Sequence, residues 1–289
     1  MATQITNQAQ ISFAYGSQYG TATSNIATTT IQGPLTVGKT SLESTYRSGD
    51  IVTYILTTSN TSTSVLNDVT IVDNLGSYLP VGSSAYVTPL TYTGAAQLYI
   101  NGIYMSGINP SVTANSITFV INALPANANA IIIYNARINN SAALNTGSYI
   151  TNTATWTATN MSDNMYDINT IAVADYADVR IFKSMSPNPV TDGSQLTYTF
   201  TLYNYGNVAA TDVVLSDTFH PAPNPITVTV NGLTIGSEDF SYSNSTLRLP
   251  ADGSSLSVNV PEATFTQDPV TGEIAVVPGI TVITVMGTL

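Results

Sequence analysis

Apolar and polar residues alternate with a period of two along most of this chain, and no segment shows the spacing of a helical face. Between residues 196 and 202, apolar side chains occupy every even position and threonine occupies every odd one. Val52, Tyr54 and Leu56 form the matching strand of the first half, and turn residues such as Asn101-Gly102 separate the expected strands. Many short strands at this spacing predict an all-β fold of antiparallel, immunoglobulin-like sandwiches. Further strands are expected at 69–73, 97–104, 116–121, 130–138 and 150–156.

The second half of the chain repeats the first, which predicts two sandwiches in tandem. Leu124-Pro125 matches Leu249-Pro250, and residues 130–138 match residues 281–289. We therefore expect an arm of residues 1–32, a first sandwich of residues 33–176 and a second of residues 177–289. The strongest matches are Lys39 with Lys183, Gly49 with Gly193, Tyr54 with Tyr198, Asn60 with Asn204, Asp68 with Asp212 and Asp73 with Asp217.

The pieces of this repeat come in an unexpected order. The first sandwich closes with residues 150–154, Ile-Thr-Asn-Thr-Ala, and the matching stretch is residues 5–9, Ile-Thr-Asn-Gln-Ala. We therefore expect the second sandwich to lack its closing strand and the N-terminal arm to carry a spare copy of it. An incomplete sandwich and a spare strand predict that copies of this chain join head to tail by strand donation. One face of the donor strand would present Ile5, Asn7, Ala9, Ile11 and Phe13.

The composition narrows the range of partners. Charged residues make up 8% of the chain, against about 25% in typical soluble domains, and the formal net charge is −11. The 6 lysines and arginines argue against binding to nucleic acid or to anionic membrane surfaces. No cysteine is present to form disulfides or thiolate metal sites. No apolar run reaches the ~20 residues of a membrane helix, so we expect no membrane insertion.

The first residues, Met1-Ala2-Thr3-Gln4, contain neither the basic region nor the apolar core of a secretory signal. Two explanations are open: a signal was removed from this sequence, or the protein is released by a route other than general secretion. The second explanation favours assembly on spores, where lysis of the mother cell exposes the product. The expected location is therefore extracellular, on the surface of a bacterial cell or spore.

Two phrases of the repeat resemble a family of bacterial surface domains. Residues 39–73 and residues 183–217 each contain a lysine strand, a glycine turn, a Thr-Tyr strand, an asparagine turn and an aspartate near a strand end. This order resembles the conserved repeat domain of bacterial surface proteins known as domain of unknown function eleven. The resemblance covers both sandwiches and implies a structural or adhesive role outside the cell. The second copy departs from it by lacking a closing strand and by having His220-Pro221 where a Leu-Pro pair is usual.

The two lysines of the chain, Lys39 and Lys183, occupy equivalent positions. Strand alternation predicts that Lys39, Asp73 and Asn152 all face the core of the first sandwich. Burial favours the neutral amine and the protonated acid, so the amine can attack the asparagine carboxamide while the aspartate transfers protons and ammonia leaves. The order of lysine, aspartate and asparagine resembles the intramolecular isopeptide sites of collagen-adhesin-type and pilin domains of Gram-positive bacteria.

The same chemistry is expected between copies of the chain. The second sandwich has Lys183 and Asp217, and a strand donated in the register of the first sandwich would bring Asn7 beside them. The alternative is a buried ion pair of each lysine with its aspartate, capped by the asparagine. The candidate catalytic residues are thus Asp73 and Asp217, and the candidate cross-links are Lys39 with Asn152 and Lys183 with Asn7.

Other candidate sites have weaker support. His220, the only histidine, lies in a proline-rich loop without a nucleophile elbow, which argues against a Ser-His-Asp hydrolase. Asp163 with Asp167, or Asp175 with Asp178, would supply calcium ligands, but turn carboxylates are the alternative explanation because neither pair has the spacing of a known calcium loop. No phosphate-binding glycine loop or metalloprotease motif is present. We expect no cofactor and no metal.

These observations predict a structural protein, the subunit of an extracellular bacterial filament that polymerises head to tail by donor-strand complementation and is locked by isopeptide bonds. The alternative is a monomeric two-domain surface adhesin that binds a host protein or glycan. That alternative requires the N-terminal strand to fold into the second sandwich of its own chain. An enzyme is the least supported class, because no catalytic constellation is visible apart from autocatalytic isopeptide formation.

Overall fold

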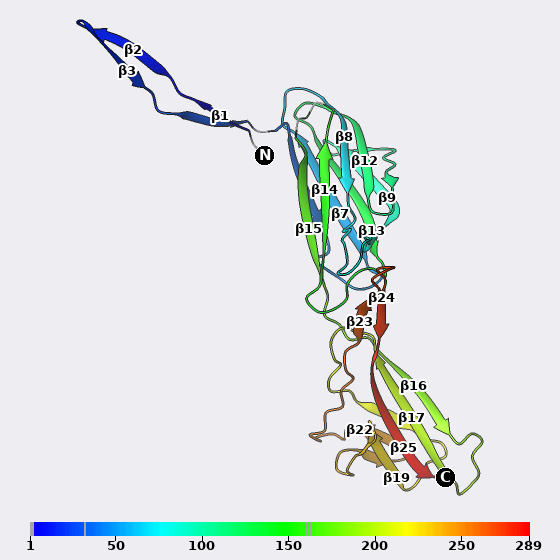
Figure 1. The fold of residues 1–289 in the computed structure, drawn as a ribbon. Coiled ribbons are helices and arrows are strands. Elements are labelled where there is room, and N and C mark those ends of the chain that lie inside the picture. The colour runs from blue at the N-terminus through cyan, green and yellow to red at the C-terminus, as the bar shows by residue number, and fades with distance from the viewer. Residues whose placement is uncertain (1–2, 32, 160, 162) are drawn as a thin grey trace.

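The computed structural model describes residues 3–31, 33–159, 161 and 163–289, and every regular element in it is a β-strand. The strands form an arm and two sandwiches, with the first sandwich standing between the arm and the second (Figure 1). The fold class predicted from the alternation, tandem antiparallel sandwiches, is confirmed. Among the described residues, no helix is long and apolar enough to cross a membrane.

The first sandwich consists of two facing sheets. One has the strand order β10–β9–β13–β7–β5, formed by Ile103–Met105, Leu90–Ile100, Asn129–Ile138, Ile51–Asn60 and Leu35–Ser41. The other has the order β11–β12–β8–β14–β15–β6, formed by Ser111–Val112, Ile117–Leu124, Leu66–Asp73, Tyr149–Thr157, Met165–Val173 and Thr45–Tyr46. β14 pairs with both β8 and β15, and β15 also lies beside β5, the edge strand of the opposite sheet. We call β14 and β15 the closing pair.

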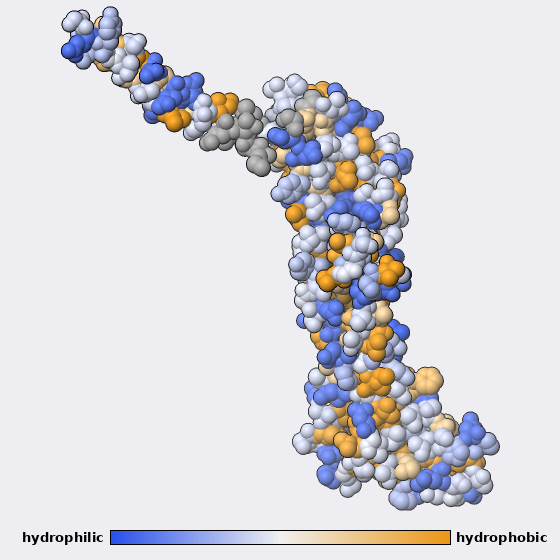
Figure 2. Space-filling model, in the orientation of Figure 1, coloured by the Kyte–Doolittle hydropathy of each residue, from blue (hydrophilic) through white to orange (hydrophobic). Residues whose placement is uncertain are grey.

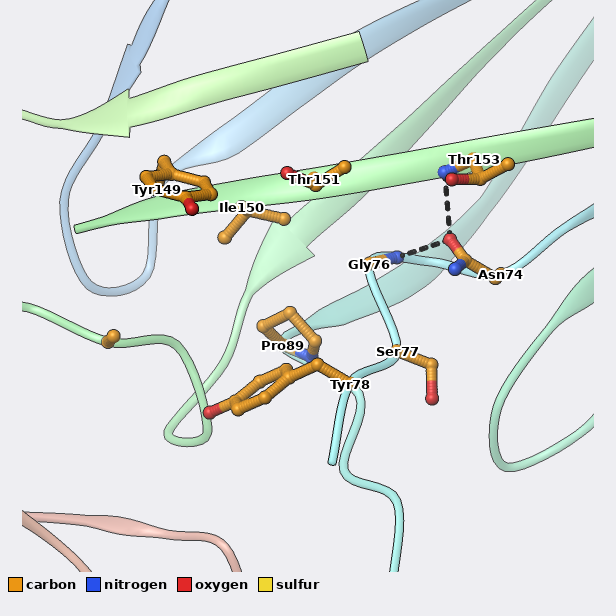
Figure 3. A pocket seen from close by; sticks show the side chains of 10 residues that line it. Asn74, Gly76, Ser77, Tyr78, Pro89, Tyr149, Ile150, Thr151 and Thr153 are labelled. Atoms are coloured by element: carbon orange, nitrogen blue, oxygen red, sulfur yellow. Dashed lines mark hydrogen bonds between the residues drawn. The ribbon is translucent and has the colours of Figure 1, made fainter. Parts of the chain in front are cut away.

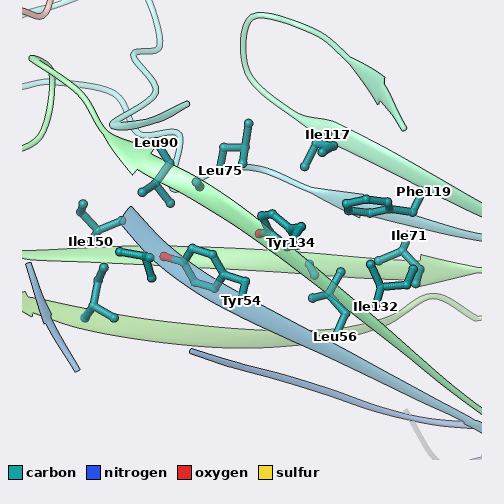
Figure 4. Packing of buried hydrophobic residues seen from close by; sticks show 14 of the residues in the cluster. Tyr54, Leu56, Ile71, Leu75, Leu90, Ile117, Phe119, Ile132, Tyr134 and Ile150 are labelled. Carbon is teal, nitrogen blue, oxygen red and sulfur yellow. The ribbon is translucent and has the colours of Figure 1, made fainter. Parts of the chain in front are cut away.

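The inward-facing residues of the two sheets form one core. The closing pair contributes Trp156 to this core, and its indole N–H donates to the hydroxyl of Thr58 at 2.7 Å. The polar atom of the ring is therefore satisfied although the side chain is fully buried. Figure 4 shows part of this packing, with Tyr54, Leu56, Ile71, Phe119, Ile132, Tyr134 and Ile150 among the labelled residues.

The second sandwich repeats one sheet of the first and only part of the other. The complete sheet has the order β16–β17–β25–β19–β20, formed by Val179–Ser186, Gln195–Asn204, Gly279–Thr288, Ile226–Val230 and Leu233–Thr234. The partial sheet has the order β18–β22–β21, formed by Leu215–Thr218, Thr246–Leu249 and Ser241–Ser243. β18 pairs with β22 on one side. No described residue pairs with its other side, which is where β14 pairs with β8 in the first sandwich.

The strand pairing shows that one predicted match of the repeat, Leu124-Pro125 with Leu249-Pro250, is wrong. Leu124 lies opposite Leu66, whose counterpart in the repeat is Ala210. Ala210 bridges Val260 and not Leu249. The counterpart of Leu124-Pro125 is therefore Val260-Pro261. Leu249 lies opposite Leu215 and so corresponds to Phe119, which lies opposite Ile71. Ten residues separate Leu249 from Val260 and four separate Phe119 from Leu124, so the second sandwich contains an insertion of six residues that the repeated Leu-Pro dipeptide concealed.

The arm is a β-hairpin. β1 (Thr3–Asn7) and β2 (Gln10–Tyr15) run outward, and β3 (Gln18–Thr23) and β4 (Ala27–Ile31) return antiparallel to them. The hairpin projects from the end of the first sandwich that is remote from the second (Figure 1). The sequence predicted the outgoing strand but not the returning one, because residues 27–30 contain three successive threonines and no apolar alternation.

Asn207 joins the two sandwiches. Its side-chain amide donates to the carbonyl oxygens of Leu144 and Ala174 at 3.0 Å each, and its Oδ1 accepts the N–H of Tyr176 at 2.9 Å. β23 (Thr264–Gln267) and β24 (Ile274–Val277) also extend from the second sandwich to the first, where Phe265 enters the core. The two sandwiches are thus connected by both polar and apolar contacts.

Replacing Asn207 with alanine is expected to lower the free energy of unfolding by about 1–3 kcal/mol, because the main-chain groups that it satisfies would stay buried without partners. Urea unfolding followed by the fluorescence of Trp156 measures the effect on the first sandwich. The exposed Asn109, changed to alanine, is the matched control and should shift stability by no more than about 0.5 kcal/mol. Equal effects of the two substitutions would show that Asn207 does not stabilise the junction.

Candidate functional site

Lys39 and Asp73 form an ion pair between the two sheets of the first sandwich. Lys39 lies on β5 and Asp73 is the last residue of β8, and both side chains are fully buried. The ammonium of Lys39 donates to Asp73 Oδ2, while the N–H of Leu75 donates to Asp73 Oδ1 at 2.9 Å. The structure therefore brings these two predicted site residues into direct contact inside the core.

Tyr134 on β13 connects this pair to Asn152. Its hydroxyl donates to Asp73 Oδ2 at 2.5 Å, and it accepts from Lys39 Nζ at 3.4 Å and from Asn152 Nδ2 at 3.3 Å. Tyr134 is a site residue that the sequence pattern did not predict. The available signal was its inward position on an alternating strand, since it lies directly opposite the inward-facing Tyr54 of β7.

Asn152 occupies the middle of β14 and is fully buried. Its Oδ1 accepts the N–H of Gly76 at 3.2 Å, which polarises the carbonyl of the carboxamide. The turn that contains Gly76 is tied to β14 because Asn74 Oδ1 accepts both the Gly76 N–H at 3.0 Å and the Thr153 N–H at 2.9 Å (Figure 3). The asparagine is thus fixed within one network with Lys39 and Asp73.

Burial and neighbouring charge set the protonation of this network. Desolvation lowers the pKa of Lys39, although Asp73 opposes that shift. Desolvation also raises the pKa of Tyr134 well above its ordinary value, and the charge of Asp73 adds to the rise. Lys39 is therefore closer to the neutral amine that a nucleophile requires, and Tyr134 remains a hydrogen-bond donor. The arrangement is suited either to a Lys39–Asn152 amide, with Asp73 as the proton carrier, or to a hydrogen-bonded ion pair.

The second sandwich contains the same ion pair in an open setting. Lys183 Nζ donates to Asp217 Oδ2 at 2.5 Å, and the two side chains are 37% and 21% exposed, against 0% for each partner in the first sandwich. The rings of Tyr198, Phe200 and Phe219 lie 5.1, 5.3 and 5.4 Å from the Lys183 ammonium. Aromatic rings thus lie on one side of this ion pair, and solvent reaches it from the other side.

The position of Tyr134 is occupied by Val285 in the second sandwich. Tyr134 lies opposite Tyr54 on β7, and Val285 lies opposite the equivalent Tyr198 on β17. The second ion pair therefore lacks the hydroxyl that bridges the lysine, the aspartate and the asparagine in the first.

Among the described residues, no strand pair covers Lys183 as the closing pair covers Lys39. In the first sandwich β15 lies beside β5, and Asp167 of β15 accepts the main-chain N–H of Lys39 at 2.7 Å. β16 is the counterpart of β5, and on the face that it shares with Lys183 the side chains of Val179, Ile181 and Met185 are 39%, 57% and 52% exposed. We call this side of β16, together with the unpaired edge of β18, the acceptor face.

The arm exposes the residues that were predicted to complete the second sandwich. Asn7 and Ala9 are exposed, as are Ile5, Ile11 and Phe13. Figure 2 shows hydrophobic residues at the surface of the arm and of the second sandwich. The arm and the second sandwich lie at opposite ends of the molecule (Figure 1), so the structure does not bring Asn7 to Lys183 within one chain. A contact between these two residues requires two copies.

The structure also shows where the weaker candidates lie. His220 is exposed in its loop, and Asp178 pairs with Arg180 at 2.9 Å. Asp167 binds the main chain of β5, as described above, and not Asp163. Within the described part of the chain, no group of three or more histidine, aspartate or glutamate side chains is placed to hold a metal ion.

No family model and no curated protein matches the chain, so the resemblance to the conserved repeat domain stays a prediction. Several solved structures of bacterial surface proteins are similar to it. The major pilin BcpA of Bacillus cereus is 10% identical with a TM-score of 0.39, over 95% of this chain and 81% of BcpA. The pilus backbone RrgB of Streptococcus pneumoniae is 14% identical with a TM-score of 0.36, over 84% of this chain and 54% of RrgB. The collagen adhesin CNA of S. aureus is 14% identical with a TM-score of 0.31, over 54% of this chain and 55% of CNA.

Removal of the carboxylate is expected to cost far more stability in the first sandwich than in the second. Asp73→Ala leaves a buried ammonium without a partner and should lower the free energy of unfolding by about 3–5 kcal/mol. Asp217→Ala should cost no more than about 1 kcal/mol in the monomer, because Lys183 reaches water. Urea unfolding followed by near-ultraviolet circular dichroism compares the two variants with the wild type. Equal losses would contradict the difference in burial.

The Lys39–Asn152 amide is tested by intact mass. We expect the folded wild-type protein to be lighter than its sequence mass by one ammonia, because the neutral amine, the polarised carboxamide and the proton carrier are in one buried network. Asp73→Ala should restore the sequence mass. Since that variant also loses stability, Asn152→Ala provides a second unreactive protein. A folded wild type with the unmodified mass would identify the network as an ion pair.

Proposed function

We propose that this protein is the structural subunit of an extracellular filament on the bacterial cell surface. Copies would join head to tail when the arm of one copy inserts on the acceptor face of the next. The single observation that supports this most is the correspondence between the arm and the closing pair. The arm is a two-stranded hairpin, and a two-stranded closing pair is what the described second sandwich lacks.

The inner half of the arm, β1 with β4, can be matched to the closing pair strand by strand, whereas beyond Asn7 the arm shifts its register by one residue and the closing pair does not. Ile5 lies opposite Thr29 in the arm, and its match Ile150 lies opposite Ile171 in the closing pair. The returning strands follow the same register, because Thr28 of the arm takes the place of Thr170. Each of these threonines lies opposite the threonine that precedes the asparagine, Thr6 in the arm and Thr151 in the closing pair. β1 and β4 would therefore enter the second sandwich as one preformed pair.

One core position supports docking in this register. In the first sandwich Trp156 of the closing pair donates to Thr58. The repeat puts Ile11 in the place of Trp156 and Leu202 in the place of Thr58. A polar pair in the first sandwich becomes an apolar pair at the joint, so neither partner leaves a hydrogen-bonding group unsatisfied. Burial of each large apolar side chain of the arm would add about 1.5–3 kcal/mol.

The order of elements at the proposed joint between copies is the same as at the junction between the two sandwiches of one chain. Within the chain, the closing pair leads through residues 174–178 into β16, the first strand of the next sandwich. The arm leads through residues 32–34 into β5, again the first strand of a sandwich. A docked arm would thus place the first sandwich of one copy after the second sandwich of another, as the second follows the first within a chain. Repetition of one such heterologous contact produces an open filament.

The alternatives have less support. A monomeric adhesin would need the arm to close the second sandwich of its own chain, whereas the arm projects from the opposite end (Figure 1). The similarity to a pilus backbone and a major pilin is too low to carry the proposal, and nothing favours the spore surface over the cell surface. We propose a structural protein and not an enzyme, with a second copy of the chain as its partner.

Charge on the inward face of the arm is expected to prevent assembly. Ile11→Asp would bury a carboxylate opposite Leu202, which abolishes docking, so negative-stain microscopy should show only single particles. Ser12→Asp places the same charge on the opposite face of the same strand and should leave filaments intact. Deletion of residues 3–31 should also yield single particles. Normal filaments from Ile11→Asp and from the deletion would refute assembly through the arm.

A further inference from the structure

We infer that the joint between copies is covalent, with an isopeptide bond from Lys183 of one copy to Asn7 of the next and with Asp217 as the proton carrier. The inference rests on the proposed function, because the two residues meet only when an arm docks on an acceptor face. It extends that function by naming the site at which the partner copy supplies a missing reactive group.

The register of the closing pair determines where Asn7 would lie. In the first sandwich Ala154 lies opposite Asp73 across the β14–β8 ladder. Ala9 would therefore lie opposite Asp217, and Asn7 would take the inward place of Asn152, two residues earlier. A slip by one residue would turn Asn7 and the apolar residues of the arm toward solvent, which the loss of apolar burial opposes.

The acceptor side already holds the other two groups together. Lys183 and Asp217 are in contact at 2.5 Å beneath aromatic rings, yet both remain partly open to solvent on the side that the arm would cover. Covering them removes water from the pair, and desolvation favours the neutral amine and the protonated acid over the ion pair. Docking would thus supply the carboxamide and create the reactive protonation state in the same event.

Val285 makes an unreacted asparagine less stable at the joint than in the first sandwich. Asn152 Nδ2 donates to the hydroxyl of Tyr134, whereas Asn7 would meet the aliphatic side chain of Val285 at that position. A buried amide group that loses an acceptor is destabilised. Departure of this nitrogen as ammonia removes the group that lost its acceptor, so the loss of the Tyr134 hydroxyl favours the bond at the joint.

The reaction balances without a further reactant. Nζ of Lys183, as the neutral amine, attacks Cγ of Asn7, and a C–N bond forms as the bond from Cγ to Nδ2 breaks. Asp217, as the protonated acid, passes its proton to the departing nitrogen, which leaves as ammonia, and takes a proton from the attacking nitrogen. An amine and a primary amide thus become a secondary amide and ammonia.

Wild-type filaments boiled in detergent are the direct test. We expect a ladder of multimers on a denaturing gel. Proteolysis and tandem mass spectrometry of the ladder should yield a branched peptide that joins Lys183 to Asn7 and is lighter than its two parts by one ammonia. Filaments that boil to monomer would overturn the covalent joint and leave the proposed function standing. A wild-type protein that forms no filaments would overturn both.

Variants separate the bond from the docking. Lys183→Met keeps the apolar stem and removes the amine, and Asn7→Ala removes the carboxamide without changing the acceptor face. Each should still form filaments under the microscope, and each should boil to monomer. Gln8→Ala, on the outward face of the same arm strand, should keep the full ladder. A ladder that persists in either Lys183→Met or Asn7→Ala filaments would overturn the assignment.

Discussion

The structure depends on one constraint: the inner faces of a β-sandwich must be covered. In the first sandwich the closing pair provides this cover, because β14 pairs with β8 and β15 lies beside β5. Lys39 and Asp73 consequently lie in a dry core. In the second sandwich the same lysine and aspartate are in contact but partly exposed, and apolar side chains of β16 face solvent. The two sandwiches thus allow one site to be compared, within one chain, with and without a closing pair over it.

Cover changes what the lysine–aspartate pair can do. An exposed ion pair contributes little to stability. A buried pair has lost its hydration, so desolvation pushes the lysine toward the neutral amine and makes each hydrogen bond in the network more important. In the first sandwich the hydroxyl of Tyr134 supplies a hydrogen bond to the buried pair. In the second sandwich Val285 stands at that position and has no group that can form one. The lysine–aspartate pair therefore differs between the two sandwiches in its burial and in its hydrogen-bond partners.

The hairpin form of the arm suits a donor. A strand that is already paired has fixed much of its backbone before docking, so less conformational entropy is lost on association than for a flexible segment. Its exposed apolar residues, such as Ile11 and Phe13, and the unpaired edge of β18 are both hazards for nonspecific aggregation in a free subunit. A specific joint that buries them together removes both.

The sequence by itself determined the strands, the tandem repeat and the inward positions of Lys39, Asp73 and Asn152, because side chains on a strand alternate between two faces and a repeated pattern implies a repeated unit. Tertiary structure alone decided which strands pair. It moved the counterpart of Leu124-Pro125 to Val260-Pro261, since pairing follows the hydrogen-bond ladder and not a shared dipeptide. It also paired the arm with a threonine-rich returning strand and placed Tyr134 at the centre of the ion-pair network. Contacts between strands far apart in the chain depend on register and on the distance between sheets, and neither quantity is encoded in local alternation.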